Sequence, residues 1–212
     1  PEMSRGLGDV YKRQSFVFSE LLKLGDKLPY GKVRMSWAQV GSDTDPYQLG
    51  LVYTKSKFAY PGYTIGYISN GTIPNKDLKP TKTNSFEMGL ELKFLKNRIG
   101  LDFTYYSQLS KNQIMGMASS STSGYGYRLI NAGEIENKGV EIALNTRPIQ
   151  TKDFSWDLNF NFSKNSNKVK KLVDDMDMFE LEKATWLDVQ VAAKVGENFG
   201  SIVGPDFQRN EN

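Results

Sequence analysis

Five carboxylates have the residue type that acid–base chemistry requires, and each lies on the polar side of an alternating stretch. Two carboxylates can act as acid and as base or nucleophile, as in glycoside hydrolysis. The same polar faces also carry cations, so the carboxylates can instead form ion pairs with a structural role, and we favour this interpretation. The carboxylates are Glu87, Glu91, Asp102, Glu141 and Asp157, and the cations are Arg34, Lys93 and Arg98.

The composition excludes most other site chemistry. The 212 residues contain no histidine and no cysteine, which removes the Ser-His-Asp triad, histidine metal sites, disulfides and cysteine nucleophiles. The formal net charge is only +3, and scattered cations of this kind do not form a nucleic-acid-binding surface. We therefore expect a protein that is not an enzyme, with no catalytic, cofactor-binding or metal-binding residue and no cofactor. Its ligand-binding residues stay unassigned.

Two segments leave a binding role open. The acidic residues 174–177 could supply oxygens to Ca²⁺, but they lack the glycine turn and terminal glutamate of an EF-hand loop. We favour a solvated loop for this segment. Tyr125 and Tyr127 could stack on a sugar or peptide, or could be aromatic residues at a membrane interface, and we favour the interface.

Strict alternation of apolar and polar residues predicts the strands that carry the charged residues. In residues 85–94 every second side chain is apolar, and residues 98–106, 139–145 and 154–163 repeat the pattern. Leu95, Lys96 and Asn97 form the first short turn, and a second contains Pro148 and Lys152. Long connections alternate with these short turns. The chain therefore resembles an antiparallel meander.

Strands of about 9 to 11 residues are long enough for a tilted crossing of a bilayer, whereas soluble strands average about 5 to 6 residues. We predict an all-β fold, an antiparallel meander forming part of a large transmembrane β-barrel. The alternative is a secreted β-sandwich that binds carbohydrate, because a sandwich also buries one face of each sheet. The predicted outward-facing residues are Phe86, Met88, Leu90, Leu92, Ile99, Leu101, Phe103, Val140, Ile142, Leu144, Trp156, Leu158, Phe160 and Phe162.

The remaining segments give weaker predictions. Residues 30–41 alternate as a strand with Val33, Met35 and Trp37 on one face, and residues 19–24 predict a short helix with Ser19 as N-cap. Residues 47–82 predict a long loop with short strands near Tyr53 and Tyr63. Weak strand patterns lie at residues 15–18, 189–195 and 201–203. Residues 1–14 show neither the period of a helix nor that of a strand, and they resemble translated sequencing-adaptor sequence. We therefore expect a non-native N-terminal segment in residues 1–14 and a partial barrel in residues 15–212.

Four segments resemble the SusC/RagA family of TonB-dependent outer-membrane transporters. Residues 78–90 are similar to the family's "NP-L-KPE-T-S-E-GL" motif, and residues 131–141, which read NAGEIENKGVE, are similar to its "NAG-IENKG-E" motif. Residues 156–165 resemble its "W-N-NFSKNKNKV" strand, and residues 33–45 resemble its "LRASYAQVGNDT" segment. The chain departs from the family motif before Leu78. The family usually has Asn-Pro shortly before this leucine, whereas here Pro74 and Asn75 lie further away, with Lys76 and Asp77 between them and Leu78.

The resemblance implies import of large nutrients, oligosaccharides or oligopeptides, through a multi-pass barrel in the Gram-negative cell outer membrane. It also implies a SusD-like surface lipoprotein as partner, and a TonB complex that acts through an N-terminal plug. Nothing in this chain resembles the plug, and the family barrel has about twenty-two strands, so we expect a fragment truncated at both ends. The resemblance assigns no residue to the nutrient, and we expect contact with membrane lipid but none with nucleic acid.

Overall fold

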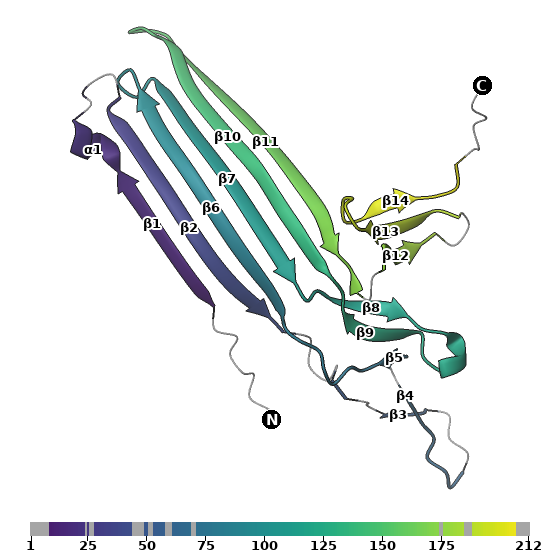
Figure 1. The fold of residues 1–212 in the computed structure, drawn as a ribbon. Helices are drawn as coiled ribbons and strands as arrows, with labels where there is room; N and C mark the ends of the chain where they lie inside the picture. The colour runs from purple at the N-terminus through teal and green to yellow at the C-terminus, as the bar shows by residue number, and fades with distance from the viewer. Residues whose placement is uncertain are drawn as a thin grey trace.

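The main part of the molecule is a six-stranded antiparallel sheet whose strands follow one another in chain order (Figure 1). The structure is a computed structural model that describes residues 9–23, 25, 28–43, 49–50, 53–57, 61–68, 71–173, 176–184 and 188–206. The predicted all-β meander is confirmed, although the sheet is open within this chain. Its strands are β1 (Val10–Val17), β2 (Tyr30–Ser42), β6 (Thr81–Phe94), β7 (Ile99–Lys111), β10 (Glu134–Gln150) and β11 (Ser155–Lys171).

The strands extend further than the alternation predicted. β10 and β11 each have 17 residues, and β11 includes the segment 164–171 that has no apolar alternation. Pro148 was expected in the turn but lies inside β10, beside the register shift between Thr146 and Ile149. A shift of this kind leaves a residue without ladder partners, so the missing N–H of proline is tolerated there. Lys152 does lie in the turn.

The two short turns close one end of the sheet. Leu95, Lys96 and Asn97 join β6 to β7, and all three have positive φ, at 49°, 57° and 68°. In the turn between β10 and β11, the Thr151 N–H donates to the Phe154 carbonyl at 2.7 Å. These tight connections fix the register of each hairpin and place its polar and apolar faces.

A short helix, α1 (Phe18–Leu22), joins β1 to β2. Ser19 is not its N-cap as predicted, because Val17 holds that position without a side-chain bond, and Ser19 is buried. The ring of Phe18, the first residue of the helix, lies over Gly31, where a Cβ would collide with it. No described helix has the length and apolar character needed to cross a membrane.

The lead predicted for residues 1–14 falls partly outside the described residues. Val10 to Gln14 lie in β1 and pair with Gln39 to Met35 of β2. Pairing of this kind depends on backbone groups, so it does not test whether the segment is native. That assignment, and the boundary of the barrel at residue 15, stay predictions.

The long connections lie at the other end of the sheet and contain small sheets of their own (Figure 1). The strand predicted near Tyr53 is confirmed, whereas the one near Tyr63 lies at Gly66–Ile68 instead. The weak patterns at residues 189–195 and 201–203 are also confirmed. The elements are β3 (Tyr53–Lys55), β4 (Gly66–Ile68), β5 (Thr72–Ile73), β8 (Ile114–Ala118), η2 (Ser121–Ser123), β9 (Tyr127–Asn131), β12 (Met178–Lys183), β13 (Gln190–Lys194) and β14 (Ser201–Val203).

A small hydrophobic core lies at this long-loop end rather than in the large sheet. Val169 of β11 is fully buried against Leu172, Phe179 and Ala193. Lys194, which follows Ala193, donates a hydrogen bond to Glu197 at 2.7 Å, and this bond raises the pKa of Lys194. These contacts around Val169 pack β12 and β13 against the end of β11.

Candidate functional site: the two faces of the sheet

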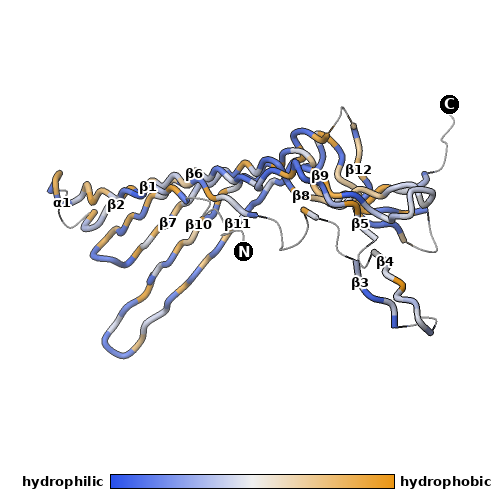
Figure 2. Tube along the Cα trace, turned by 90° about the horizontal axis from the view of Figure 1, so that it is seen from below, coloured by the Kyte–Doolittle hydropathy of each residue, from blue (hydrophilic) through white to orange (hydrophobic). Residues whose placement is uncertain are grey.

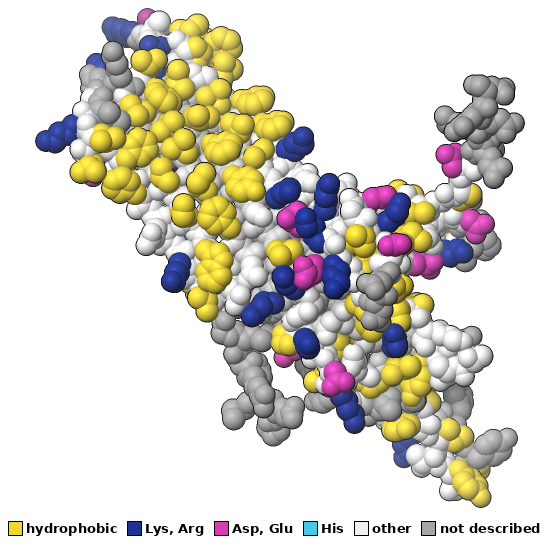
Figure 3. Space-filling model, in the orientation of Figure 1, with side chains coloured by type: hydrophobic (Ala, Val, Ile, Leu, Met, Phe, Trp, Pro, Cys, Tyr) yellow, Lys and Arg dark blue, Asp and Glu magenta, His cyan; other side chains and the backbone are white. Residues whose placement is uncertain are grey.

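One face of the six-stranded sheet is a continuous apolar band (Figure 3). Residues directly opposite one another in a ladder point to the same face, so the register defines rows that cross the sheet. The central row is entirely apolar, and every residue predicted to face outward shares its side. This row contains Phe16, Val33, Leu90, Phe103, Ile142 and Phe162.

Large side chains of this band are exposed. Met35 is 48% exposed, Met88 40% and Phe160 59%, and no second layer covers them within the described residues. In Figure 2, hydrophobic and hydrophilic residues alternate along β10 and β11. An apolar band of this extent is unfavourable in water and favourable against hydrocarbon. The band is therefore a lipid-facing surface.

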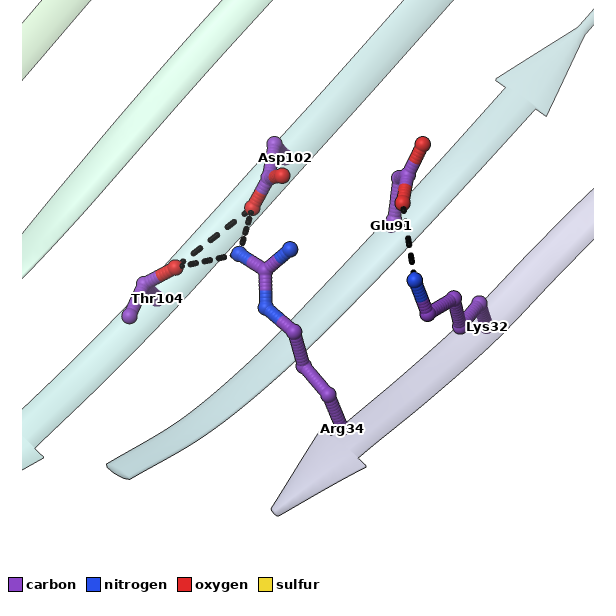
Figure 4. Close-up of polar contacts among 5 residues, drawn as sticks. All are labelled: Lys32, Arg34, Glu91, Asp102 and Thr104. Carbon is purple, nitrogen blue, oxygen red and sulfur yellow. Dashed lines mark hydrogen bonds and ion pairs between the residues drawn. The ribbon is translucent and has the colours of Figure 1, made fainter. Parts of the chain in front are cut away.

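The opposite face carries a charged network centred on Arg34 of β2 (Figure 4). Its Nη2 donates hydrogen bonds to Asp102 Oδ1 at 2.6 Å and to Thr104 Oγ1 at 2.9 Å, both on β7. Arg34 therefore spans β6, the strand between them. Arg34 and Asp102 are about one-third exposed, at 31% and 36% of their side chains, as suits a polar surface that is open to water.

Gly89 makes this span possible. It lies between Arg34 and Thr104 in the ladder, and a Cβ at this position would lie 2.7 Å from Arg34 Cγ and 3.0 Å from Cδ. With no side chain in the way, the guanidinium reaches the second strand along. Gly139 does the same for Tyr106, whose hydroxyl donates to Asn165 Oδ1 at 3.2 Å.

Of the other predicted charged residues, two carboxylates have a cationic partner and two cations have partners of another kind. Glu91 pairs with Lys32 at 3.9 Å, and Asp157 accepts a hydrogen bond from Arg147 at 2.6 Å. Lys93 lies instead over the ring of Tyr30, 5.0 Å from its centroid. Arg98 lies in the turn directly before β7, beside Lys93 and Asp157 of the polar face, and donates to the carbonyls of Arg147 and Pro148.

The arrangement of charged residues on this polar face suits ion pairing better than catalysis. Glu91 and Asp102 are directly opposite in the ladder, yet each has a cation as partner, Lys32 for Glu91 and Arg34 for Asp102. No group of three acidic, histidine or cysteine side chains among the described residues could hold a metal ion. Asp174 and Asp175, the centre of the calcium hypothesis, lie outside the described residues. Glu87 and Glu141 share the polar face with Tyr106 and Thr104 as ladder partners.

Replacing Arg34 with Met is expected to lower the free energy of unfolding by about 0.5–1 kcal/mol, because the ion pair is partly exposed. A double-mutant cycle with Asp102→Asn measures the coupling between the two side chains. We expect a favourable coupling in a full-length receptor that carries this segment. Additive single-mutant effects would show that the two side chains do not interact in the folded protein.

The division between an apolar and a polar face matches a known family of membrane proteins. The family described as TonB dependent receptor-like, beta-barrel matches residues 22–192. The chain belongs to this family. TonB-dependent receptor barrels lie in the outer membrane, so the six-stranded sheet is part of a transmembrane wall. Its apolar band faces lipid, and its charged face lines the interior.

Two TonB-dependent receptors illustrate the relationship in sequence. TonB-dependent receptor P3 of Formosa agariphila is 31% identical over 196 residues, which cover 88% of this chain and 19% of P3. TonB-dependent receptor SusC of Bacteroides thetaiotaomicron is 31% identical over 184 residues, which cover 83% of this chain and 18% of SusC. The chain therefore spans about a fifth of the length of these receptors.

Solved structures of a transporter show the same fold. The structure of the RagAB peptide transporter superposes with a TM-score of 0.76 at 20% sequence identity, covering 89% of this chain and 20% of that chain. The structure of the RagAB peptide importer in the "open-open" state superposes with a TM-score of 0.70. At this identity the likeness concerns the fold, and it agrees with the family assignment.

Two of the motifs shared with TonB-dependent transporters meet at the long-loop end. Asn131 donates from Nδ2 to the carbonyls of Lys79 and Asn112, at 2.7 Å and 3.0 Å, and accepts from the Lys79 N–H at 2.8 Å. One amide therefore joins the loops that precede β6 and follow β7. Sequence reasoning did not predict this link. The signal was present as two separate motif resemblances, at residues 78–90 and 131–141.

Proposed function

We propose that this segment is part of the wall of an outer-membrane transporter that imports large nutrients, either oligosaccharides or oligopeptides. The observation that carries the proposal is the separation of faces, with an apolar band outside and paired charges inside. A polar interior lined by ion pairs such as Arg34–Asp102 suits the passage of hydrated cargo. The names of two similar proteins agree, since one is SusC and the other a peptide transporter.

A SusD-like surface lipoprotein is the partner that we propose. In outer-membrane barrels the long loops face the outside of the cell, and here they carry small sheets with a packed core around Val169. A packed core of this kind would give a lid a preformed surface, so less entropy would be lost on docking. Coupling to TonB would act through a plug, which we propose lies elsewhere in the longer protein.

The two rival functions have less support. A secreted β-sandwich requires a second sheet over the apolar band, and the described residues place none there. The family assignment points away from it as well. A carboxylate enzyme requires an acid and a base free to react with substrate, whereas Glu91, Asp102 and Asp157 each have a cationic partner. The relatives are receptors and transporters.

The proposal is tested with a full-length receptor that carries this segment, expressed in its own outer membrane with an affinity tag. We expect a surface lipoprotein to copurify, and uptake of labelled oligosaccharides or oligopeptides that stops when the proton-motive force is dissipated. The two cargo classes are supplied separately, so the class that is accumulated identifies the substrate. Uptake that persists without the proton-motive force would contradict energy-coupled import.

A further inference from the structure

A group of lysines lies on the outer face of the wall, where the apolar band ends toward the long loops. Figure 3 shows dark blue side chains of lysine or arginine along the border of the yellow band on this side. Lys164 follows Phe162 by two residues on the same face of β11, and Lys138 shares a row with Phe86 and Ser107. We call this group the lysine belt, and it consists of Lys82, Lys111, Lys138, Lys164, Lys168 and Lys170.

The lysine belt carries more positive charge than its neighbours neutralise. Glu136 pairs with both Lys138 and Lys170, at 3.3 Å and 3.4 Å, and Glu134 pairs with Lys111 at 3.3 Å. Lys82, Lys164 and Lys168 form no ion pair with any residue that the structure describes. These three are exposed. The belt therefore has unpaired ammonium groups beside a lipid-facing surface.

The opposite margin of the same face is different. Near the short turns the outer rows end on Phe94, Ile99, Leu158 and Trp156. Toward the short turns the strand rows of this face therefore end on apolar and aromatic residues, with Lys96 and Lys152 beyond them in the turns, whereas toward the long loops lysines lie within the strands themselves. Such asymmetry matches a membrane whose two leaflets carry different charge, with the anionic headgroups at the level of the lysine belt.

We propose that the lysine belt binds the phosphate groups of a lipid A-type glycolipid in the outer leaflet. The acyl chains of such a lipid lie along the apolar band, and its phosphates lie at the height of Lys164 and Lys168. Lysine binds phosphate as a mobile point charge, and its alkyl stem can follow the apolar surface to reach the headgroup. The proposal concerns the membrane placement of the wall and is independent of the cargo.

The test measures binding of lipid A bisphosphate to the purified full-length receptor in neutral detergent, by native mass spectrometry. The variant K164Q/K168Q is expected to bind this lipid at least about tenfold more weakly, since each lysine near an anionic surface contributes severalfold to affinity. The matched control is K96Q/K152Q, which removes two exposed lysines from the short turns at the other margin. The control is expected to bind as the parent protein does.

Two further measurements separate phosphate recognition from acyl-chain contact and from misfolding. Dephosphorylated lipid A is expected to bind the parent protein as weakly as lipid A bisphosphate binds K164Q/K168Q. K164R/K168R keeps both charges and is expected to restore binding. Equal binding of phosphorylated and dephosphorylated lipid, or an equal loss in K96Q/K152Q, would overturn the proposal. Heat-modifiable migration on SDS gels confirms that each variant is a folded barrel.

Discussion

Lysine in place of Leu90 is expected to lower the free energy of unfolding in lipid by about 2–4 kcal/mol, the cost of a lysine at the bilayer midplane on the lipid-facing side of a barrel. Leu90 lies in the central apolar row, between Val33 and Phe103. A lysine here must either place its ammonium group in hydrocarbon or distort the surrounding lipid. The measurement is equilibrium unfolding of a full-length receptor in lipid vesicles.

Glu91→Lys is the matched control, because the same new side chain enters the adjacent position on the opposite face. Glu91 loses only its 3.9 Å pair with Lys32, and the new ammonium lies opposite Asp102 on a polar surface. We expect a cost below about 1 kcal/mol, which is the usual value of an exposed ion pair. Equal costs for Leu90→Lys and Glu91→Lys would mean that the two faces are assigned incorrectly.

Alanine in place of Gly133 is expected to lower the free energy of unfolding by at least about 2 kcal/mol. Two effects add: φ is +78°, a region that costs an L-residue about 1–2 kcal/mol, and the new Cβ would collide with the backbone carbonyl of Lys171. Since this obstacle is backbone, β11 itself must shift. The same vesicle unfolding experiment measures the loss.

Gly124→Ala separates the two effects. Gly124 has nearly the same φ, +77°, but nothing lies within 4 Å of the place where its Cβ would be. We expect Gly124→Ala to cost about 1 kcal/mol, from backbone strain alone. If Gly133→Ala were no worse than Gly124→Ala, the close approach of residue 133 to β11 would not contribute to stability. Gly133 lies in the NAG motif, so the comparison also tests the structural role of that motif.

The six-stranded sheet was predictable because its strands lie between an apolar and a polar environment, so apolar and polar residues alternate along them. Residues 85–94 alternate without an exception that matters, and β6 contains all of them. The elements that were not predicted lie where this alternation is absent. β11 continues through residues 164–171, where no apolar alternation is present and Val169 is the one apolar residue. β12 was missed because it directly follows the acidic residues 174–177, which predicted a solvated loop.

The polar site was predictable in kind but not in detail. The carboxylates and cations were placed on one face, and Arg34 does pair with Asp102. These residues are 68 positions apart, so their contact depends on the register of two intervening ladders. The backbone partners of Arg98, the carbonyls of Arg147 and Pro148, could not be predicted because Arg98 belongs to a turn, where the period of two no longer gives a direction. The link made by Asn131 joins loops that have no period at all.

β11 has two different environments along its length, because part of it faces lipid and Val169 lies in a protein core. Phe160 and Phe162 face hydrocarbon, whereas Val169 is fully buried against Leu172 and Phe179. Burial away from water has a large heat-capacity signature and weakens on cooling, but packing against lipid lacks this driving force. Cooling should therefore loosen the loop end while the wall stays intact, so that the outer part of a single strand becomes the temperature-sensitive part of the receptor.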